Sequence, residues 1–328
     1  MSSWILFAVC SFVVVLAAMR LAEYGDVIAL RTGLGGMFVG TLLMAAATSL
    51  PELLTTINAL QFGEPNLAAG NLLGSNMFNM LMLAILDMTH HRKRILRKAA
   101  RKHALSGSLA VLMISLVVLF ILADIPVQIG WVGGDSLVLI GAYLGATYLL
   151  QAGSRSAPEQ RSDPPPGTLS LPLALFGFGL ATAALIYVSP LLVEASVSIA
   201  ESTGLGTTFV GTTLVALVTS LPEAVTTFAA ARIGAEDMAI GNLFGSNMFN
   251  MVALGITDLF FVSGRLIGFI DPSFLLVAAF GLVMTALAVV GNVAKLETRI
   301  LFVEVDAALL ILLYAGGMWL LYTRGIGA

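Results

Sequence analysis

The pentapeptide Thr-Ser-Leu-Pro-Glu occurs twice in this chain, at residues 48–52 and at residues 219–223. It belongs to a longer repeat whose two copies are 171 positions apart throughout (223 − 52, for example). The other matching segments are GLGGMFVGT at 33–41 with GLGTTFVGT at 204–212, and GNLLGSNMFNM at 70–80 with GNLFGSNMFNM at 241–251. The repeat indicates two copies of one structural unit, with cores at residues 33–80 and 204–251.

The composition excludes a soluble globular protein. Apolar residues make up 58% of the 328 positions and charged residues 11%, and the mean hydropathy is +0.97. Soluble domains are about 45–50% apolar and about 25% charged. A helix needs about 20 mostly apolar residues to cross a bilayer. Ten segments qualify: residues 4–30, 36–62, 67–88, 104–123, 130–150, 170–201, 207–231, 237–262, 272–291 and 302–322.

Five spans lie on each side of a linker at residues 151–169, whose prolines, serines and charges are typical of a solvated segment. Because five is odd, the second copy enters the membrane from the opposite side, as in many secondary transporters. The sequence therefore predicts an all-α integral membrane fold. Its ten transmembrane helices form two inverted-topology five-helix repeats, residues 1–150 and 170–328. The first span lacks a signal-peptide pattern, and the single cysteine, Cys10, is expected to pack inside it.

Basic residues predict the orientation, because cytoplasmic loops carry the excess of Lys and Arg. One alternating set of loops includes the strongly basic segment 92–102, whereas the other set holds only Arg265 and Arg324. We expect a multi-pass protein of the cell (inner) membrane with both termini outside and the linker in the cytoplasm. The basic segment could also contact lipid headgroups, but a topology anchor is the favoured interpretation. The three histidines near it, His90, His91 and His103, are interpreted as solvated rather than as metal ligands.

Glu52 and Glu223 are the leading candidates for function. A charged side chain in mid-membrane costs on the order of 2.5–3.5 kcal/mol on insertion scales unless it has a partner. No lysine or arginine lies in the matching segments. The remaining partners are a bound cation or protons.

Neighbouring side chains favour a cation. Thr48, Ser49, Thr219 and Ser220 supply hydroxyl oxygens next to the glutamates, and Ser75, Asn79, Ser246 and Asn250 supply oxygens from the following helix. In each half the Ser and Asn are four residues apart, so they share one helix face. Oxygen ligands suit hard cations such as Ca²⁺. The absence of His and Cys from this group argues against zinc, copper and iron.

Other residues of the repeat have structural interpretations. Pro51 and Pro222 each remove a helical hydrogen bond, and carbonyls freed at membrane depth are tolerated where they line a polar site. Four glycines, Gly70, Gly74, Gly241 and Gly245, form a small-xxx-small pattern that lets helices approach closely. Asn71 is assigned to capping or packing.

These motifs resemble the calcium:cation antiporter superfamily, most closely its sodium/calcium exchanger branch. The resemblance implies a compact ten-helix fold with four ion sites around two glutamates, and long first and sixth helices that slide to alternate access. The ligands that it implies are Glu52, Glu223, Thr48, Ser49, Thr219, Ser220, Ser75, Ser246, Asn79 and Asn250, with the backbone carbonyls of Ala45 and Ala216.

Three departures from the family pattern matter. Ala47 and Val218 stand where the family usually has glycine. Asn250 stands where potassium-dependent relatives carry aspartate, so the chain resembles potassium-independent exchangers. The large cytoplasmic domain of animal exchangers is missing, and the short linker indicates a prokaryotic protein without a regulatory calcium-binding domain.

The predicted function is exchange of Ca²⁺ for Na⁺, with H⁺/Ca²⁺ exchange as the alternative because the glutamates could carry protons. No run of carbonyls or charges resembles a channel filter, and no enzyme arrangement is found in the spans. We expect inorganic cations and the lipid bilayer as partners, no nucleic acid and no cofactor. The oligomeric state stays open and is compatible with a monomer.

Overall fold

The computed structural model describes residues 3–34, 36–61, 63–89, 95–156, 168–203, 216–294, 299–300 and 303–323. In the first half, these form α1 (Ser3–Thr32), α2 (Gly36–Phe38), the π-helix η1 (Val39–Met44), α3 (Ala45–Gln61), α4 (Pro65–Thr89), α5 (Ile95–Ala123) and α6 (Gly134–Ser156). The second half contains α7 (Leu171–Thr203), α9 (Ala216–Thr219), α10 (Leu221–Arg232), α11 (Glu236–Asp258), the 3₁₀ helix η3 (Leu266–Phe269), α12 (Phe274–Ala294) and α13 (Val305–Thr323).

Eight helices in the described part of the chain are long and apolar enough to cross a membrane. They correspond to eight of the ten predicted spans. The predicted span 207–231 falls on α9 and α10, and its residues 207–215 lie outside the described residues. The predicted span 237–262 falls on α11. Nearly every residue of α11 is buried. It is not among the eight apolar helices, and its burial shows that it faces protein rather than lipid.

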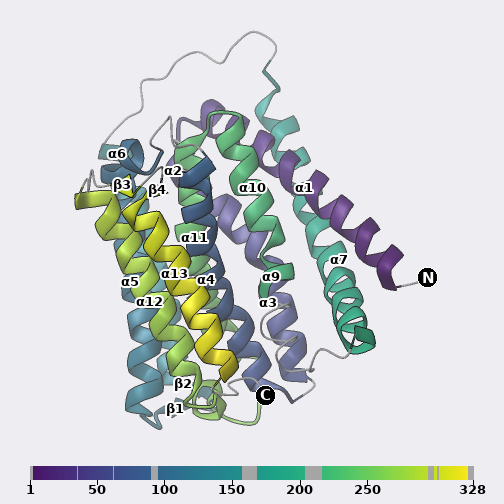
Figure 1. Cartoon of the computed structure of the whole chain (residues 1–328), viewed down its shortest axis with the longest axis vertical. Coiled ribbons are helices and arrows are strands. Elements are labelled where there is room, and N and C mark those ends of the chain that lie inside the picture. Colours follow the sequence, from purple (N-terminus) through teal and green to yellow (C-terminus); the bar gives the residue numbers. More distant parts are fainter. Residues whose placement is uncertain are drawn as a thin grey trace.

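The long helices form two groups. α1 packs along α7 as a tilted pair on one side of the molecule, while α4, α5, α11, α12 and α13 pack together on the other (Figure 1). α3 and α10 lie between these groups, since α10 contacts both α1 and α11, and α3 contacts both α7 and α11. The helices that carry the repeated motifs therefore lie at the centre.

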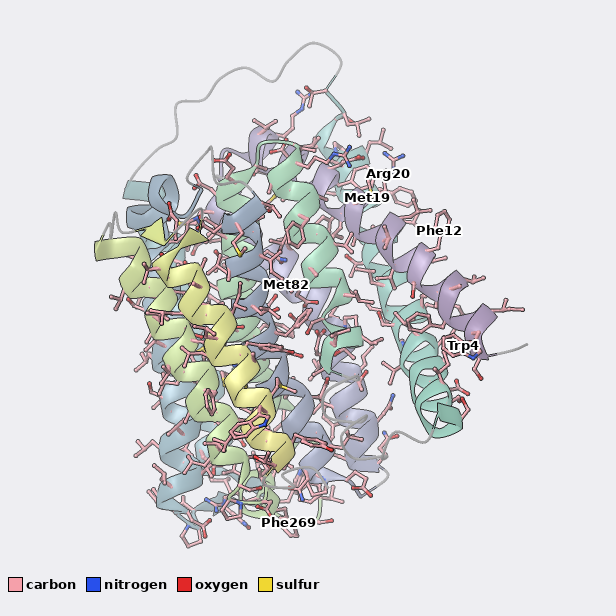
Figure 2. The ribbon with its side chains drawn as sticks, in the orientation of Figure 1. Trp4, Phe12, Met19, Arg20, Met82 and Phe269 are labelled. Carbon is pink, nitrogen blue, oxygen red and sulfur yellow. The ribbon has the colours of Figure 1, made fainter. Side chains whose placement is uncertain are left out.

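Large apolar side chains cover the outside of the bundle. Trp4 and Phe12 on α1 are 60% and 64% exposed and point away from the other helices (Figure 2). Exposed apolar side chains over so much of a surface are expected where the solvent is lipid. Together with the eight apolar helices, they make the chain a multi-pass membrane protein.

Glycines bring the backbones of η1 and α11 into contact. A Cβ atom added to Gly245 would lie 2.1 Å from the Thr41 carbonyl oxygen, and one added to Gly40 would lie 2.3 Å from the Met238 carbonyl oxygen. A Cβ at Gly241 would lie 2.9 Å from the Met37 carbonyl oxygen. The packing role predicted for Gly241 and Gly245 is confirmed, and that of Gly70 and Gly74 stays a prediction.

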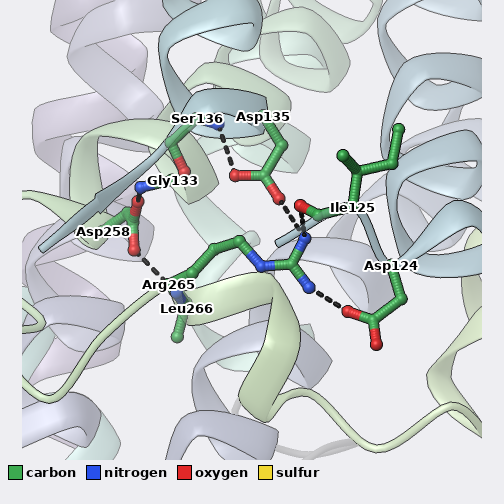
Figure 3. Close-up of polar contacts among 8 residues, drawn as sticks. All are labelled: Asp124, Ile125, Gly133, Asp135, Ser136, Asp258, Arg265 and Leu266. Carbon is green, nitrogen blue, oxygen red and sulfur yellow. Dashed lines mark hydrogen bonds and ion pairs between the residues drawn. The ribbon is translucent and has the colours of Figure 1, made fainter. Parts of the chain in front are cut away.

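A polar cluster, which we call the Arg265 cluster, joins residues of the two halves (Figure 3). It consists of Asp124, Asp135, Asp258 and Arg265. The Arg265 guanidinium donates to Asp124, to the Ile125 carbonyl oxygen at 2.7 Å and to Asp135 at 3.2 Å. The Asp258 carboxylate accepts the backbone N–H groups of Gly133 and Leu266, each at 2.7 Å.

The repeat places related residues at opposite ends of the molecule. The hairpin β1 (Gln128–Ile129) with β2 (Val132–Gly133) lies at one end, and the hairpin β3 (Arg299–Ile300) with β4 (Val303–Glu304) lies at the other (Figure 1). Asp87 and Asp306 are the repeat equivalents of Asp258 and Asp135, respectively, each 171 positions away. With Glu304, they form a second carboxylate group whose oxygens lie within 4.8 Å of one another.

The interpretation of His103 as solvated is wrong. Its side chain is buried, and its Nε2 atom lies 3.5 Å from an oxygen of Asp237 on α11. The reason is that α5 begins at Ile95 rather than near residue 104, so His103 lies two turns inside a packed helix. His90 and His91 lie outside the described residues.

Candidate cation site

The two Thr-Ser-Leu-Pro-Glu segments meet in the middle of the molecule, on helices that differ in form. α3 continues through Pro51 without interruption. The equivalent helix of the second half is interrupted at Ser220, between α9 and α10, with Pro222 in the first turn of α10. A proline in the first turn of a helix removes only a donor that would have no partner there.

Each glutamate is held by a serine from the other half of the chain. The Ser49 hydroxyl donates to Oε1 of Glu223 at 2.7 Å, and the Ser220 hydroxyl lies 3.1 Å from Oε1 of Glu52. Ser220 also lies 2.9 Å from the Ser75 hydroxyl. Both glutamates are only 1% exposed. Four of the predicted ligands are thus joined across the two halves, with Ser75 next to them.

A set of buried oxygen atoms has no hydrogen-bond partner in the described part of the chain. These are Oε2 of Glu52, Oε2 of Glu223, Oδ1 of Asn79, Oδ1 of Asn250 and Oγ of Ser246. Within the described residues, neither glutamate forms an ion pair with a basic side chain. Buried polar atoms without a partner are rare and need an explanation. All five belong to residues that the sequence predicted as cation ligands.

Two asparagines that the sequence analysis did not single out orient the predicted ones. The Asn79 amide nitrogen donates to Oδ1 of Asn247 at 3.0 Å, and the Asn250 amide nitrogen donates to Oδ1 of Asn76 at 3.1 Å. Because the amide nitrogens are engaged between α4 and α11, the amide oxygens of Asn79 and Asn250 are left as acceptors. Asn76 and Asn247 could have been noticed in the sequence, because each is part of the Gly-Ser-Asn-x-x-Asn motif that is repeated in both halves.

The predicted threonines and carbonyls lie together beside the glutamates. The Thr219 hydroxyl is 3.2 Å from the Ala216 carbonyl oxygen, which also accepts the Ser220 N–H at 3.1 Å. In the first half, the Thr48 hydroxyl is 3.4 Å from the Ala45 carbonyl oxygen and 3.1 Å from that of Met44. The side chains of both threonines are completely buried.

The arrangement offers oxygen atoms and two carboxylates, which bring a formal charge of −2. Sulfur and imidazole ligands are absent from the residues just described. Hard cations such as Ca²⁺ and Na⁺ bind through oxygen, and Ca²⁺ takes about 6–8 oxygen ligands. The chemistry of the site therefore fits hard cations and does not fit zinc or copper.

The fold and the site define a class: helical multi-pass membrane proteins with a buried pair of carboxylates. The chain belongs to the sodium/calcium exchanger protein family, because the model of that family matches residues 2–151 and 173–323. The resemblance drawn from the repeated motifs is thus confirmed. The family consists of transporters.

Three known proteins are particularly informative. The sodium/calcium exchanger MaX1 of Methanosarcina acetivorans is 44% identical over 88 residues, which are 26% of this chain and 25% of that protein. The Ca²⁺/H⁺ antiporter ChaA of Bacillus subtilis is 26% identical over 312 residues, which are 88% of this chain and 86% of that protein. A structure of the sodium-calcium exchanger NCX_Mj has a TM-score of 0.70 and 20% identity, with 97% of each chain covered. This likeness shows a shared fold.

Proposed function

We propose that this protein is a secondary antiporter that exchanges Ca²⁺ for Na⁺ by alternating access, with the ions bound between Glu52 and Glu223. The observation that carries the proposal is the set of five buried oxygen atoms without partners, two of them carboxylate oxygens. A bound cation would supply the missing partner and would balance the formal charge of the two glutamates. Emptied of cations, the site would hold two unpaired carboxylates at membrane depth, which is costly.

The proposed ligand set is the one predicted from the sequence. It comprises Glu52, Glu223, Thr48, Ser49, Thr219, Ser220, Ser75, Ser246, Asn79 and Asn250, with the carbonyl oxygens of Ala45 and Ala216. Neutral hydroxyl and carbonyl oxygens would serve Na⁺, while the two carboxylates would balance one Ca²⁺. Both ions are transported substrates, and the proposal includes no resident cofactor.

The proposed architecture comprises ten membrane helices in two inverted repeats. The seventh helix would include α9 and α10, and the eighth would be α11. Residues 1–150 and 170–328 would be the repeats, the linker at 151–169 would be cytoplasmic, and both termini would be outside. The constant offset of 171 residues and the reciprocal serine–glutamate contacts support this arrangement.

Exchange of Ca²⁺ for protons is the second candidate. Two carboxylates can carry two protons without any of the neutral ligands, and the relative ChaA is named as a Ca²⁺/H⁺ antiporter. The hydroxyl-rich surroundings of the glutamates favour sodium, because proton transport would not require them.

The deciding experiment uses purified protein in liposomes. Calcium uptake is measured with an outward sodium gradient at equal pH, and separately with an outward proton gradient without sodium. We expect uptake in the first condition only. Uptake driven by the proton gradient alone would support the second candidate, and no uptake in either condition would contradict antiport of calcium.

A further inference from the structure

Asn71, on α4, makes hydrogen bonds to both halves of the chain. Its amide nitrogen lies 3.2 Å from the backbone carbonyl oxygen of Glu52 and 3.1 Å from the Thr56 hydroxyl. Its amide oxygen lies 3.0 Å from the hydroxyl of Thr219 in the second half. The side chain is only 1% exposed, so these contacts are made without competition from solvent. Asn71 therefore does more than cap or pack.

The direction of these hydrogen bonds follows from their chemistry. A backbone carbonyl can only accept, so the amide nitrogen of Asn71 must face Glu52. The amide oxygen then faces Thr219, and the hydroxyl of Thr219 must be the donor. A hydroxyl has one proton and two lone pairs. Once its proton is directed to Asn71, Thr219 can offer a cation nothing but lone pairs.

The same arrangement is looser in the other half. Asn242, 171 positions after Asn71, lies 3.4 Å from the Glu223 carbonyl oxygen and 3.1 Å from the Thr227 hydroxyl. Its amide oxygen is 3.4 Å from the Thr48 hydroxyl, whose nearest acceptor is instead the Met44 carbonyl oxygen at 3.1 Å. The corresponding distance in the first arrangement, from the Thr219 hydroxyl to the Asn71 amide oxygen, is 3.0 Å.

We propose that Asn71 is a positioning residue of the cation site, which orients the Thr219 hydroxyl as a ligand and joins it to the backbone of Glu52. The proposal rests on the proposed function, because it assigns Thr219 to the ion. The proposal also includes an asymmetry. The hydrogen bond between Asn242 and Thr48 is longer, so the two asparagines contribute unequally to the cation site although their sequence contexts match.

The test is a pair of double-mutant cycles, because a cycle isolates the interaction between two residues from their separate effects. One cycle combines Asn71→Leu with Thr219→Val, and the matched control combines Asn242→Leu with Thr48→Val. The quantity measured is the sodium concentration that gives half-maximal calcium exchange in liposomes. Each variant is first checked for folding by its thermal unfolding in detergent.

We expect Asn71→Leu and Thr219→Val each to raise the half-maximal sodium concentration about fivefold, the effect of losing the one hydrogen bond that these two side chains share. The half-maximal sodium concentration of the double variant should be no more than about twofold higher than that of either single variant, because both changes break the same interaction. In the control cycle, Asn242→Leu should raise the half-maximal sodium concentration only about twofold. The fold increases caused by Asn242→Leu and Thr48→Val should multiply in the double variant.

Two outcomes would overturn the proposal. One is a double variant in which the fold increases caused by Asn71→Leu and Thr219→Val multiply. The other is an equal or larger coupling for Asn242 and Thr48. If Asn71→Leu does not fold, Asn71→Ser takes its place in the same cycle. A purely structural role would lower the unfolding temperature but leave no coupling in the sodium dependence. Failure of the wild-type protein to exchange calcium for sodium would instead contradict the proposed function, which keeps the two proposals distinguishable.

Discussion

The hydroxyl of Ser49 lies 2.7 Å from Oε1 of Glu223, so a serine from the first half of the chain holds a carboxylate of the second half. In the reciprocal contact, Ser220 of the second half holds Glu52 of the first half. Neither half therefore contains a complete site.

Neutralising either glutamate should abolish calcium exchange. In Glu52→Gln or Glu223→Gln, the side chain keeps its size but the site loses one of the two charges that balance Ca²⁺. Uptake of radioactive calcium by liposomes measures the effect. The control is Glu64→Gln, which changes an exposed glutamate in the loop before α4. This variant should retain wild-type uptake. Normal exchange by either site variant would show that the assignment is wrong.

Exchange should move net charge if sodium is the counter-ion. Two protons can replace one Ca²⁺ on the two carboxylates without net charge movement, whereas neutral ligands leave room for a third sodium ion. Each charge that crosses 100 mV corresponds to about 2.3 kcal/mol. Sodium-driven uptake should therefore respond to a potential clamped with valinomycin and potassium. Uptake that is indifferent to the clamp would favour proton exchange.

Labelling of introduced cysteines should place both residues 151–167 and residues 90–102 in the cytoplasm. The prediction follows from the distribution of basic residues. Cys10, the single native cysteine, is buried and can be replaced by alanine to give a cysteine-free background. A reagent that cannot cross the membrane should leave single cysteines in either segment unmodified in intact cells. Modification in intact cells would reverse the proposed orientation.

Replacing Arg265 by leucine should destabilise the protein severely. The change removes the cation that Asp135 faces at 3.2 Å, and loss of one member of a buried ion pair typically costs about 3–5 kcal/mol. Adding Asp135→Asn should recover part of the loss, because the unpaired charge is then gone. Thermal unfolding in detergent measures both changes. Arg20→Leu is the control, since Arg20 pairs with Glu23 on the exposed side of α1, and little change is expected there.

Removal of the Thr285 hydroxyl should destabilise the contact between α11 and α12. The Asn247 amide nitrogen donates to this hydroxyl at 3.2 Å, and a buried donor left without an acceptor costs about 1–3 kcal/mol. Thr285→Val should therefore unfold at a lower temperature than Thr285→Ser, although valine fills the space better. The opposite order would show that packing, rather than the hydrogen bond, dominates at this position.

Much of the fold could be predicted because the repeat supplied information that composition alone lacks. The match between residues 70–80 and 241–251 related α11 to α4 before either helix was placed in space. The contacts of Asn76 and Asn247 could not be predicted in the same way. They depend on which face of α4 meets α11, and helical spacing within one helix does not determine that.

The error at His103 has a different physical origin. Its neighbours at 92–102 are strongly basic, which indicates a solvated loop, but α5 extends nine residues further toward its N-terminus than the apolar pattern does. Helical hydrogen bonds are satisfied within the segment, so a helix can continue beyond the bilayer without an apolar face toward lipid. Hydropathy reports the thickness of the membrane rather than the length of the helix.

The exchange of partners between the halves has a consequence for biogenesis. The ribosome releases α4 before α11 exists, and four polar residues of α4 (Asn71, Ser75, Asn76 and Asn79) are buried in the finished protein. All four have hydrogen-bond partners in the second half. Until that half is synthesised, these side chains must be satisfied by water, by lipid headgroups or by the insertion machinery. A nascent chain stalled at the linker is accordingly the form that we expect membrane quality control to recognise and degrade.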